Sequence, residues 1–166
     1  MAEQDWASFT LFIPIKSPVE EIYAAWTSQQ QLERWFLRSA VFTKADGSPR
    51  DPQDAVQIAD QYEWLWHGYP DEVNEKGVVL QENGKDLFKF SFGKAGNVTI
   101  TISEAEGESM VHLLQDEIPT DEYSKFHFHI GCSKGWVFYL ANLKSILEGG
   151  IDLRNKKLHE NEVVNS

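Results

Sequence analysis

The sequence predicts an α+β domain built from an antiparallel sheet and one long C-terminal helix. Three observations lead to this class. One strand-like segment is followed at once by two short segments with helical spacing, alternating apolar segments begin at Gln61, and a helical apolar stripe ends the domain. The 166 residues suffice for a single domain with a substantial core.

The first strand and two short helices are indicated by apolar spacing and capping residues. Phe9–Ile15 alternates at period two, which predicts a strand with one apolar face. Ser17 and Glu20 form a candidate capping box around Pro18, and Ser28 is the candidate N-cap of the second helix. The expected buried stripes are Val19, Ile22, Tyr23 and Trp26 in the first helix, and Leu32, Trp35 and Phe36 in the second.

From Gln61 the apolar period changes to two, which predicts a meander of about six antiparallel strands joined by short turns. Segments 78–81 and 110–115 belong to it, and Asn83-Gly84 suits a hairpin turn. The connection 45–59 is expected to be a long loop within the domain. The alternating sets in the other strands are Tyr62, Trp64 and Trp66; Phe88, Phe90 and Phe92; and Val98, Ile100 and Ile102.

The long C-terminal helix is indicated by apolar residues three or four positions apart, namely Phe128, Cys132, Trp136, Leu140, Leu143 and Leu147. Because Gly131 and Gly135 weaken a helix, we expect it to begin near Cys132, and Gly149-Gly150 should end it. The predicted organisation is an N-terminal extension over 1–8, one domain over 9–154 and a flexible polar tail over 155–166.

Composition excludes several classes of partner. The formal net charge is −11, so binding to nucleic acid through phosphates, or to an anionic membrane, is not expected. The single cysteine, Cys132, forbids an internal disulfide and is expected to be a small buried apolar residue. The N-terminus is acidic where a signal peptide would be basic, and no apolar stretch is long enough to span a bilayer. We therefore expect a cytoplasmic protein.

Several segments resemble one superfamily. They are Ser17-Pro18, residues 31–36, Asp152-Leu153-Arg154 and, above all, Gly135-Trp136 followed by Leu143 and Leu147-Glu148-Gly149-Gly150. Together they resemble the START-like (SRPBCC) superfamily, and most closely the homologues of the C-terminal domain of the activator of the heat-shock protein 90 ATPase. The resemblance implies the helix-grip fold: a curved antiparallel sheet wrapped around the C-terminal helix. The eukaryotic activator also has a separate N-terminal domain, which is not expected here because the first strand begins by Phe9.

The aromatic faces of the strands suggest a ligand cavity. Superfamily members commonly bind apolar molecules between sheet and helix, and this sequence has 6 Trp and 10 Phe. The alternative is that these side chains fill the core. The lining expected for a small hydrophobic or aromatic ligand is Tyr62, Trp64, Trp66, Phe88, Phe90, Phe92, Trp136 and Leu140. A register error would turn these residues to the other face.

No catalytic constellation stands out, and no cofactor or metal is expected. His127 and His129 lack further ligands at familiar spacing, so both are expected to be solvated or to cap backbone groups. His112 is expected on the wet face of its strand, although an enzyme of the cyclase or dehydratase kind could use it or Tyr62. The first hypothesis is thus non-enzymatic binding of a small apolar molecule. The second is a co-chaperone-like interaction domain, and the chain is expected to be a monomer or a weak homodimer.

Overall fold

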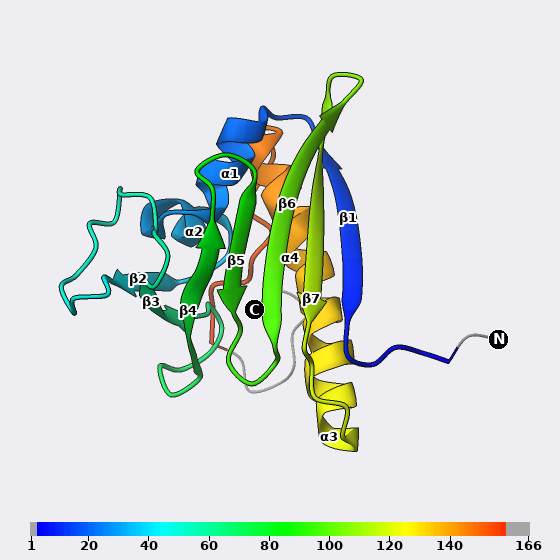
Figure 1. The fold of residues 1–166 in the computed structure, drawn as a ribbon. Helices are drawn as coiled ribbons and strands as arrows, with labels where there is room; N and C mark the ends of the chain where they lie inside the picture. The colour runs from blue at the N-terminus through cyan, green and yellow to red at the C-terminus, as the bar shows by residue number, and fades with distance from the viewer. Residues whose placement is uncertain (1–2, 159–166) are drawn as a thin grey trace.

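One seven-stranded antiparallel sheet dominates the computed structural model, which describes residues 3–158 (Figure 1). The strand order is β1-β7-β6-β5-β4-β3-β2, so β1 and β2 form the edges. The elements are β1 (Phe9–Ile15), α1 (Val19–Trp26), α2 (Gln29–Trp35), β2 (Ser39–Thr43), β3 (Gln61–Leu65), β4 (Asn74–Glu82), β5 (Leu87–Ser91), β6 (Asn97–Ala105), β7 (Glu108–Asp116), α3 (Glu122–Ser124), the π-helical turn η1 (Lys125–Ile130) and α4 (Gly131–Leu147). This confirms the α+β class and the two short helices after the first strand.

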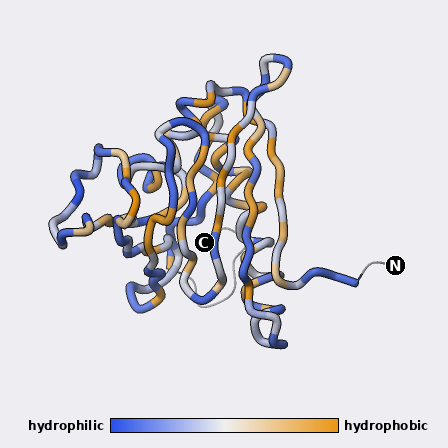
Figure 2. Tube along the Cα trace, in the orientation of Figure 1, coloured by the Kyte–Doolittle hydropathy of each residue, from blue (hydrophilic) through white to orange (hydrophobic). Residues whose placement is uncertain are grey.

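The sheet is covered on one face, here called the inner face. Figure 1 shows α4 running behind the strands, with α1 and α2 beside its C-terminal end and α3 below the ends of the strands. The period-two pattern follows from this covering, since Phe88 and Phe90 are buried while Leu87 and Lys89 are partly exposed. Apolar and polar residues accordingly alternate along the strands in Figure 2.

The structure differs from the sequence prediction at several element ends. β2 was not predicted, although Ala40 and Phe42 are buried at period two. Trp66 lies just beyond the end of β3 rather than within it. Ser28 caps α2 as predicted, by accepting a hydrogen bond from the Gln31 N–H. The Ser17 capping box is wrong, because Pro18 holds the N-cap position of α1 and the Ser17 hydroxyl donates to Glu21.

The C-terminal helix begins one residue before Cys132 and continues a helical path that starts at α3. Gly149, with φ of 82°, follows its end as expected. The loop between β2 and β3 is pinned by a buried ion pair between Arg50 and Asp60. Most of the predicted polar tail, residues 159–166, lies outside the described residues. No helix within residues 3–158 is long and apolar enough to cross a membrane.

A buried polar network ties the segment after α4 to the end of α2. The side chain of Arg154 is 2% exposed, and its guanidinium donates to the carbonyl oxygens of Glu33, Arg34 and Leu37. These carbonyls belong to the last turn of α2 and the residues beyond it, where no further helical N–H groups are available as donors. Asp152 accepts hydrogen bonds from the same guanidinium, so its charge is neutralised. The chain beyond α4 is thereby fixed against α2.

Candidate functional site

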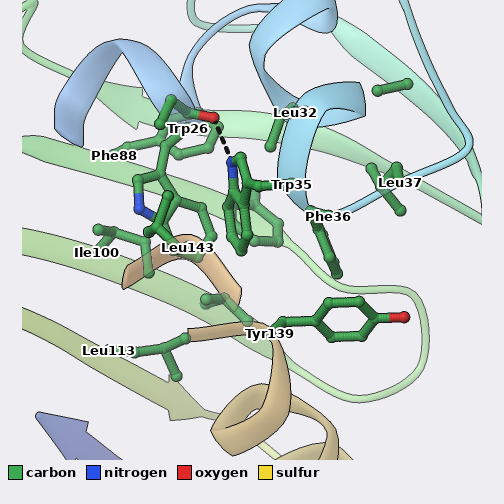
Figure 3. Close-up of a cluster of buried hydrophobic side chains, with 14 of the residues drawn as sticks. Trp26, Leu32, Trp35, Phe36, Leu37, Phe88, Ile100, Leu113, Tyr139 and Leu143 are labelled. Carbon is green, nitrogen blue, oxygen red and sulfur yellow. Dashed lines mark hydrogen bonds between the residues drawn. The ribbon is translucent and has the colours of Figure 1, made fainter. Parts of the chain in front are cut away.

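The interior next to α1 and α2 is a packed aromatic cluster (Figure 3). Trp26 and Trp35 meet edge to face with ring centroids 4.7 Å apart, and the Trp35 indole donates to the carbonyl oxygen of Ala25. The core also contains four of the expected lining residues, Trp64, Phe88, Phe90 and Leu140, each at 2% exposure or less, and Trp136 is equally buried. At these positions the side chains fill space between sheet and helix.

A cavity of about 330 Å³ adjoins this cluster near the start of α4, where the lining residues Phe36 and Trp136 contact Trp35 and Trp26. Its volume is at the lower end of the range for small-molecule sites. The walls come from the residue after α2, the segments just after β3 and β5, and α4 with the turn before it. The lining residues are Phe36, Trp66, Phe92, His127, Gly131, Cys132, Gly135, Trp136 and Tyr139. Three of the expected lining residues, Trp66, Phe92 and Trp136, are therefore brought together here.

Tyr62 is in neither group. Its ring stacks on Trp64 at 3.8 Å, and its buried hydroxyl donates to the carbonyl oxygen of Ser91. Burial raises the pKa of this phenol far above its ordinary value, so the group stays neutral. Tyr62 thus anchors β3 to β5 and is held away from the cavity of about 330 Å³.

The rings around the cavity support one another in fixed positions. Phe36 lies 5.1 Å from Trp136 and 4.8 Å from Tyr139, and Phe92 lies 5.6 Å from Trp136, all between ring centroids. The indole of Trp136 donates to Gln115 Oε1 at 2.9 Å, and Gln115 Nε2 donates to the carbonyl oxygen of Ala95. Since Gln115 is fully buried on β7, this chain of hydrogen bonds fixes the Trp136 ring relative to the sheet.

Two glycines open the helix side of the cavity. Gly131 and Gly135 are four residues apart on α4 and therefore share one face of the helix. A Cβ atom built at Gly135 would meet nothing within 4 Å, and one built at Gly131 would meet only the Phe126 carbonyl oxygen at 3.5 Å. The missing side chains leave space that the sheet does not fill.

The polar groups at the cavity are few and largely neutral. Burial raises the pKa of the Cys132 thiol to about 11, so it is protonated at neutral pH. Burial likewise raises the pKa of the Tyr139 hydroxyl well above its ordinary value. The exposed His127 ring hydrogen-bonds through Nδ1 to the Tyr123 carbonyl oxygen, which makes Nδ1 the donor and leaves Nε2 at the rim. The cavity therefore favours a ligand with an apolar body.

One carboxylate faces the inner side of the sheet close to this cavity. Glu75 on β4 stands opposite Trp64 in the β3–β4 register, and the same face continues through Gly77 to Val79. A Cβ atom at Gly93 would collide with its carboxylate, so Glu75 lies against the residue that follows Phe92. Burial raises the pKa of Glu75, and a hydrogen bond from the Lys76 N–H opposes this shift.

Three residues at or beside the cavity were not predicted from the sequence: Glu75, Phe36 and Tyr139. Glu75 could have been found by extending the period-two pattern of 78–81 backwards, because Glu75, Gly77 and Val79 share one face. Phe36 was expected to be buried, and Tyr139 lies on α4 three residues after Trp136. Their meeting at one cavity depends on how α2 approaches α4, which no local pattern encodes.

His112 and His129 lie outside the cavity. His112 is on the outer face of β7, stacked on Phe12 at 4.6 Å and bonded to the Thr101 hydroxyl, as expected for the wet face. The idea that His112 could act as a base at the cavity wall is therefore wrong. His129 is buried with Nδ1 at the Trp6 carbonyl oxygen, so His127 and His129 both bind backbone. Within residues 3–158, no three His, Cys, Asp or Glu side chains are grouped as metal ligands.

An antiparallel sheet, two short helices after its first strand and a long helix held against its inner face define a helix-grip domain of the START-like superfamily. The chain belongs to the family described as Activator of Hsp90 ATPase homolog 1-like protein, which matches residues 16–148. This confirms the resemblance read from the sequence. None of the curated proteins compared is similar enough in sequence to match.

Solved structures share this fold at low sequence identity. Protein SSP2350 from Staphylococcus saprophyticus has a TM-score of 0.67 at 18% identity, with 92% of this chain and 99% of that chain covered. The Aha1 dimer from Colwellia psychrerythraea has a TM-score of 0.65 at 16% identity, covering 86% and 97%. CalU16 from Micromonospora echinospora has a TM-score of 0.61 at 17% identity, covering 88% and 77%. At these identities the likeness shows the fold alone.

Proposed function

We propose that this domain binds a small, mainly apolar molecule between α4 and the sheet without transforming it. The observation that carries the proposal is the cavity of about 330 Å³, in which five of nine lining residues are aromatic. Such rings bury large areas and give a planar ligand stacking contacts. Trp66, Phe92 and Trp136 are the proposed contacts among the residues expected from sequence, with Phe36 and Tyr139 added by the structure.

The glycines of α4 support this proposal. A helix interior is a poor place for glycine, which costs about 1 kcal/mol relative to alanine. Gly131 and Gly135 destabilise the helix on the face that lines the cavity. No neighbouring atom is close enough to require glycine at either position. Space for a ligand accounts for both residues.

The test is binding of a neutral apolar fluorophore, N-phenyl-1-naphthylamine, together with native mass spectrometry of protein purified from its own host. Gly135→Leu should fill the cavity and abolish the fluorescence increase. Ala141→Leu is the matched control, because Ala141 is exposed on the same helix and does not line the cavity. Equal binding by the wild type and Gly135→Leu, or no binding by the wild type and no retained molecule, would contradict the proposal.

A second candidate function, protein interaction, is favoured by an apolar stripe on the outer side of the helical path. Tyr123, Phe126, Ile130 and Val137 are 43–65% exposed and lie three, four and seven residues apart. Exposed apolar patches of this kind often mark interaction sites. The family description names an activator of the Hsp90 ATPase, so an Hsp90-type chaperone is the partner to try, and a second copy of the chain is the alternative.

The interaction test compares the wild type with Phe126→Ser in a chaperone ATPase assay and in sedimentation velocity. Stimulation or self-association that Phe126→Ser removes would support this second function. Phe126 does not line the cavity, so fluorophore binding should be unchanged in the same variant. An inert wild-type protein that sediments as a monomer would contradict it.

A further inference from the structure

Glu75 is a half-buried carboxylate with no cationic partner among residues 3–158. The groups that perturb its pKa are its own burial and the Lys76 backbone N–H, with no lysine, arginine or histidine side chain among the residues described. None of the ion pairs within residues 3–158 includes Glu75. The side chain of the adjacent Lys76 is paired with Glu63 on the outer face. A carboxylate taken out of water is costly unless it is paired, so its retention on the inner face needs a reason.

The neighbours of Glu75 connect it to the cavity. It lies against Gly93, and the preceding residue, Phe92, is a cavity wall. Across β3 it stands opposite Trp64, two residues before Trp66, which is another wall. From the helix side, burial is the main cause of the raised pKa of Cys132, and the charge of Glu75 adds to it, so the carboxylate acts on a third wall residue.

Aromatic rings around a nearby negative charge suit one class of ligand. The faces of Trp and Tyr attract ammonium groups through their ring quadrupoles, and aromatic cages of this kind recognise alkylated ammonium ions. The walls supply two tryptophans, two phenylalanines and one tyrosine, and Glu75 supplies the counter-ion at their edge. The net charge of −11 further favours the approach of a cation over that of an anion.

We propose that the ligand of this cavity is an organic cation: an ammonium or similar cationic nitrogen on an apolar, preferably aromatic, body. The inference rests on the proposed function, because it assigns the chemistry of the molecule held in the same cavity. The apolar body lies among Trp66, Phe92 and Trp136, and the cationic group is directed towards Glu75.

The test is isothermal titration calorimetry at pH 7 with three indoles that differ in one group: tryptamine, tryptophol and indole-3-acetate. They carry an ammonium, a hydroxyl and a carboxylate respectively. We expect tryptamine to bind about tenfold more tightly than tryptophol, and indole-3-acetate to bind most weakly. Glu75→Gln should bind tryptophol as the wild type does and lose the preference for tryptamine. Glu72→Gln is the matched control, because it removes the same charge from an exposed position nearby.

The outcomes separate the two proposals. Equal or weaker binding of tryptamine than of tryptophol by the wild type would overturn the cation assignment and leave apolar binding standing. A preference that survives in Glu75→Gln, or disappears equally in Glu72→Gln, would overturn the role of Glu75. If none of the three indoles binds while the neutral fluorophore does, the cation assignment fails alone. If the fluorophore also fails, the proposed function fails with it.

Discussion

Replacing Gly135 by alanine should make the protein more stable while reducing the space for a ligand. Gly135 lies inside α4 with no positive φ, so alanine can adopt its backbone conformation without strain. Alanine is favoured over glycine in a helix interior by about 1 kcal/mol. A Cβ atom at Gly135 meets nothing within 4 Å, so no collision offsets this gain. We therefore expect the free energy of unfolding to rise by about 1 kcal/mol.

The assay is urea unfolding followed by tryptophan fluorescence, with the m-value compared between variants. An unchanged m-value and a higher midpoint would show a true gain in stability. In thermal unfolding the same gain should raise Tm by roughly 2–4 °C for a chain of this length. Affinity for N-phenyl-1-naphthylamine should fall in the same variant, because the new methyl group occupies cavity space.

Gly150→Ala provides the contrasting control. There a Cβ atom would lie 2.6 Å from the Ser145 hydroxyl and 2.9 Å from the Ser145 carbonyl oxygen, so alanine should destabilise. If Gly135→Ala were no more stable than the wild type, the inference that position 135 faces open space would be refuted. If Gly150→Ala were as stable as the wild type, the expected collision with Ser145 would be refuted.

Three further predictions concern the polar groups that hold the site. Arg154→Met should cost about 3–5 kcal/mol in chemical unfolding, because it leaves Asp152 and the carbonyls after α2 without their buried partner. Burial raises the pKa of Asp152, but hydrogen bonds from Arg154 outweigh this and hold it well below its ordinary value. That stabilisation is complete above about pH 4 and is lost as the pH falls further, so Asp152→Asn should differ from the wild type most at neutral pH and least in acid. Gln115→Leu should cost roughly 2–4 kcal/mol, since the Trp136 indole and the Ala95 carbonyl lose their partner, and equal melting curves would contradict this.

The buried face of each predicted strand could be predicted from the sequence, because alternating side chains can be divided between the two faces in only one way. Phe88, Phe90 and Phe92 alternate with Leu87, Lys89 and Ser91, and burying one set requires exposing the other. The expectation that His112 lies on the wet face had a different basis, namely that a lone histidine in a strand is more often exposed than buried. The period-two argument failed at β2, because Ser39–Thr43 has only two buried side chains and the pattern is too short to recognise.

Whether an inward ring fills the core or borders a cavity could not be predicted from alternation. Trp64 and Phe92 share the inner face, yet Trp64 is enclosed by Tyr62 and Phe90, whereas Phe92 lies at the strand end, where the glycines of α4 leave room. That difference depends on the distance between helix and sheet, which is set by contacts far apart in sequence. The hydrogen-bond network of Arg154 could not be predicted either, because it joins residues separated by more than a hundred positions.

The most direct test of ligand binding at this cavity is a proton–nitrogen correlation spectrum of the tryptophan indoles during titration with tryptamine. The sequence has 6 Trp, and each indole N–H gives its own signal. We predict that the signals of Trp66 and Trp136, which line the cavity, shift in a saturable manner and by more than those of Trp26 and Trp35, which do not line it. Saturation with no change at Trp66 and Trp136 would contradict the account.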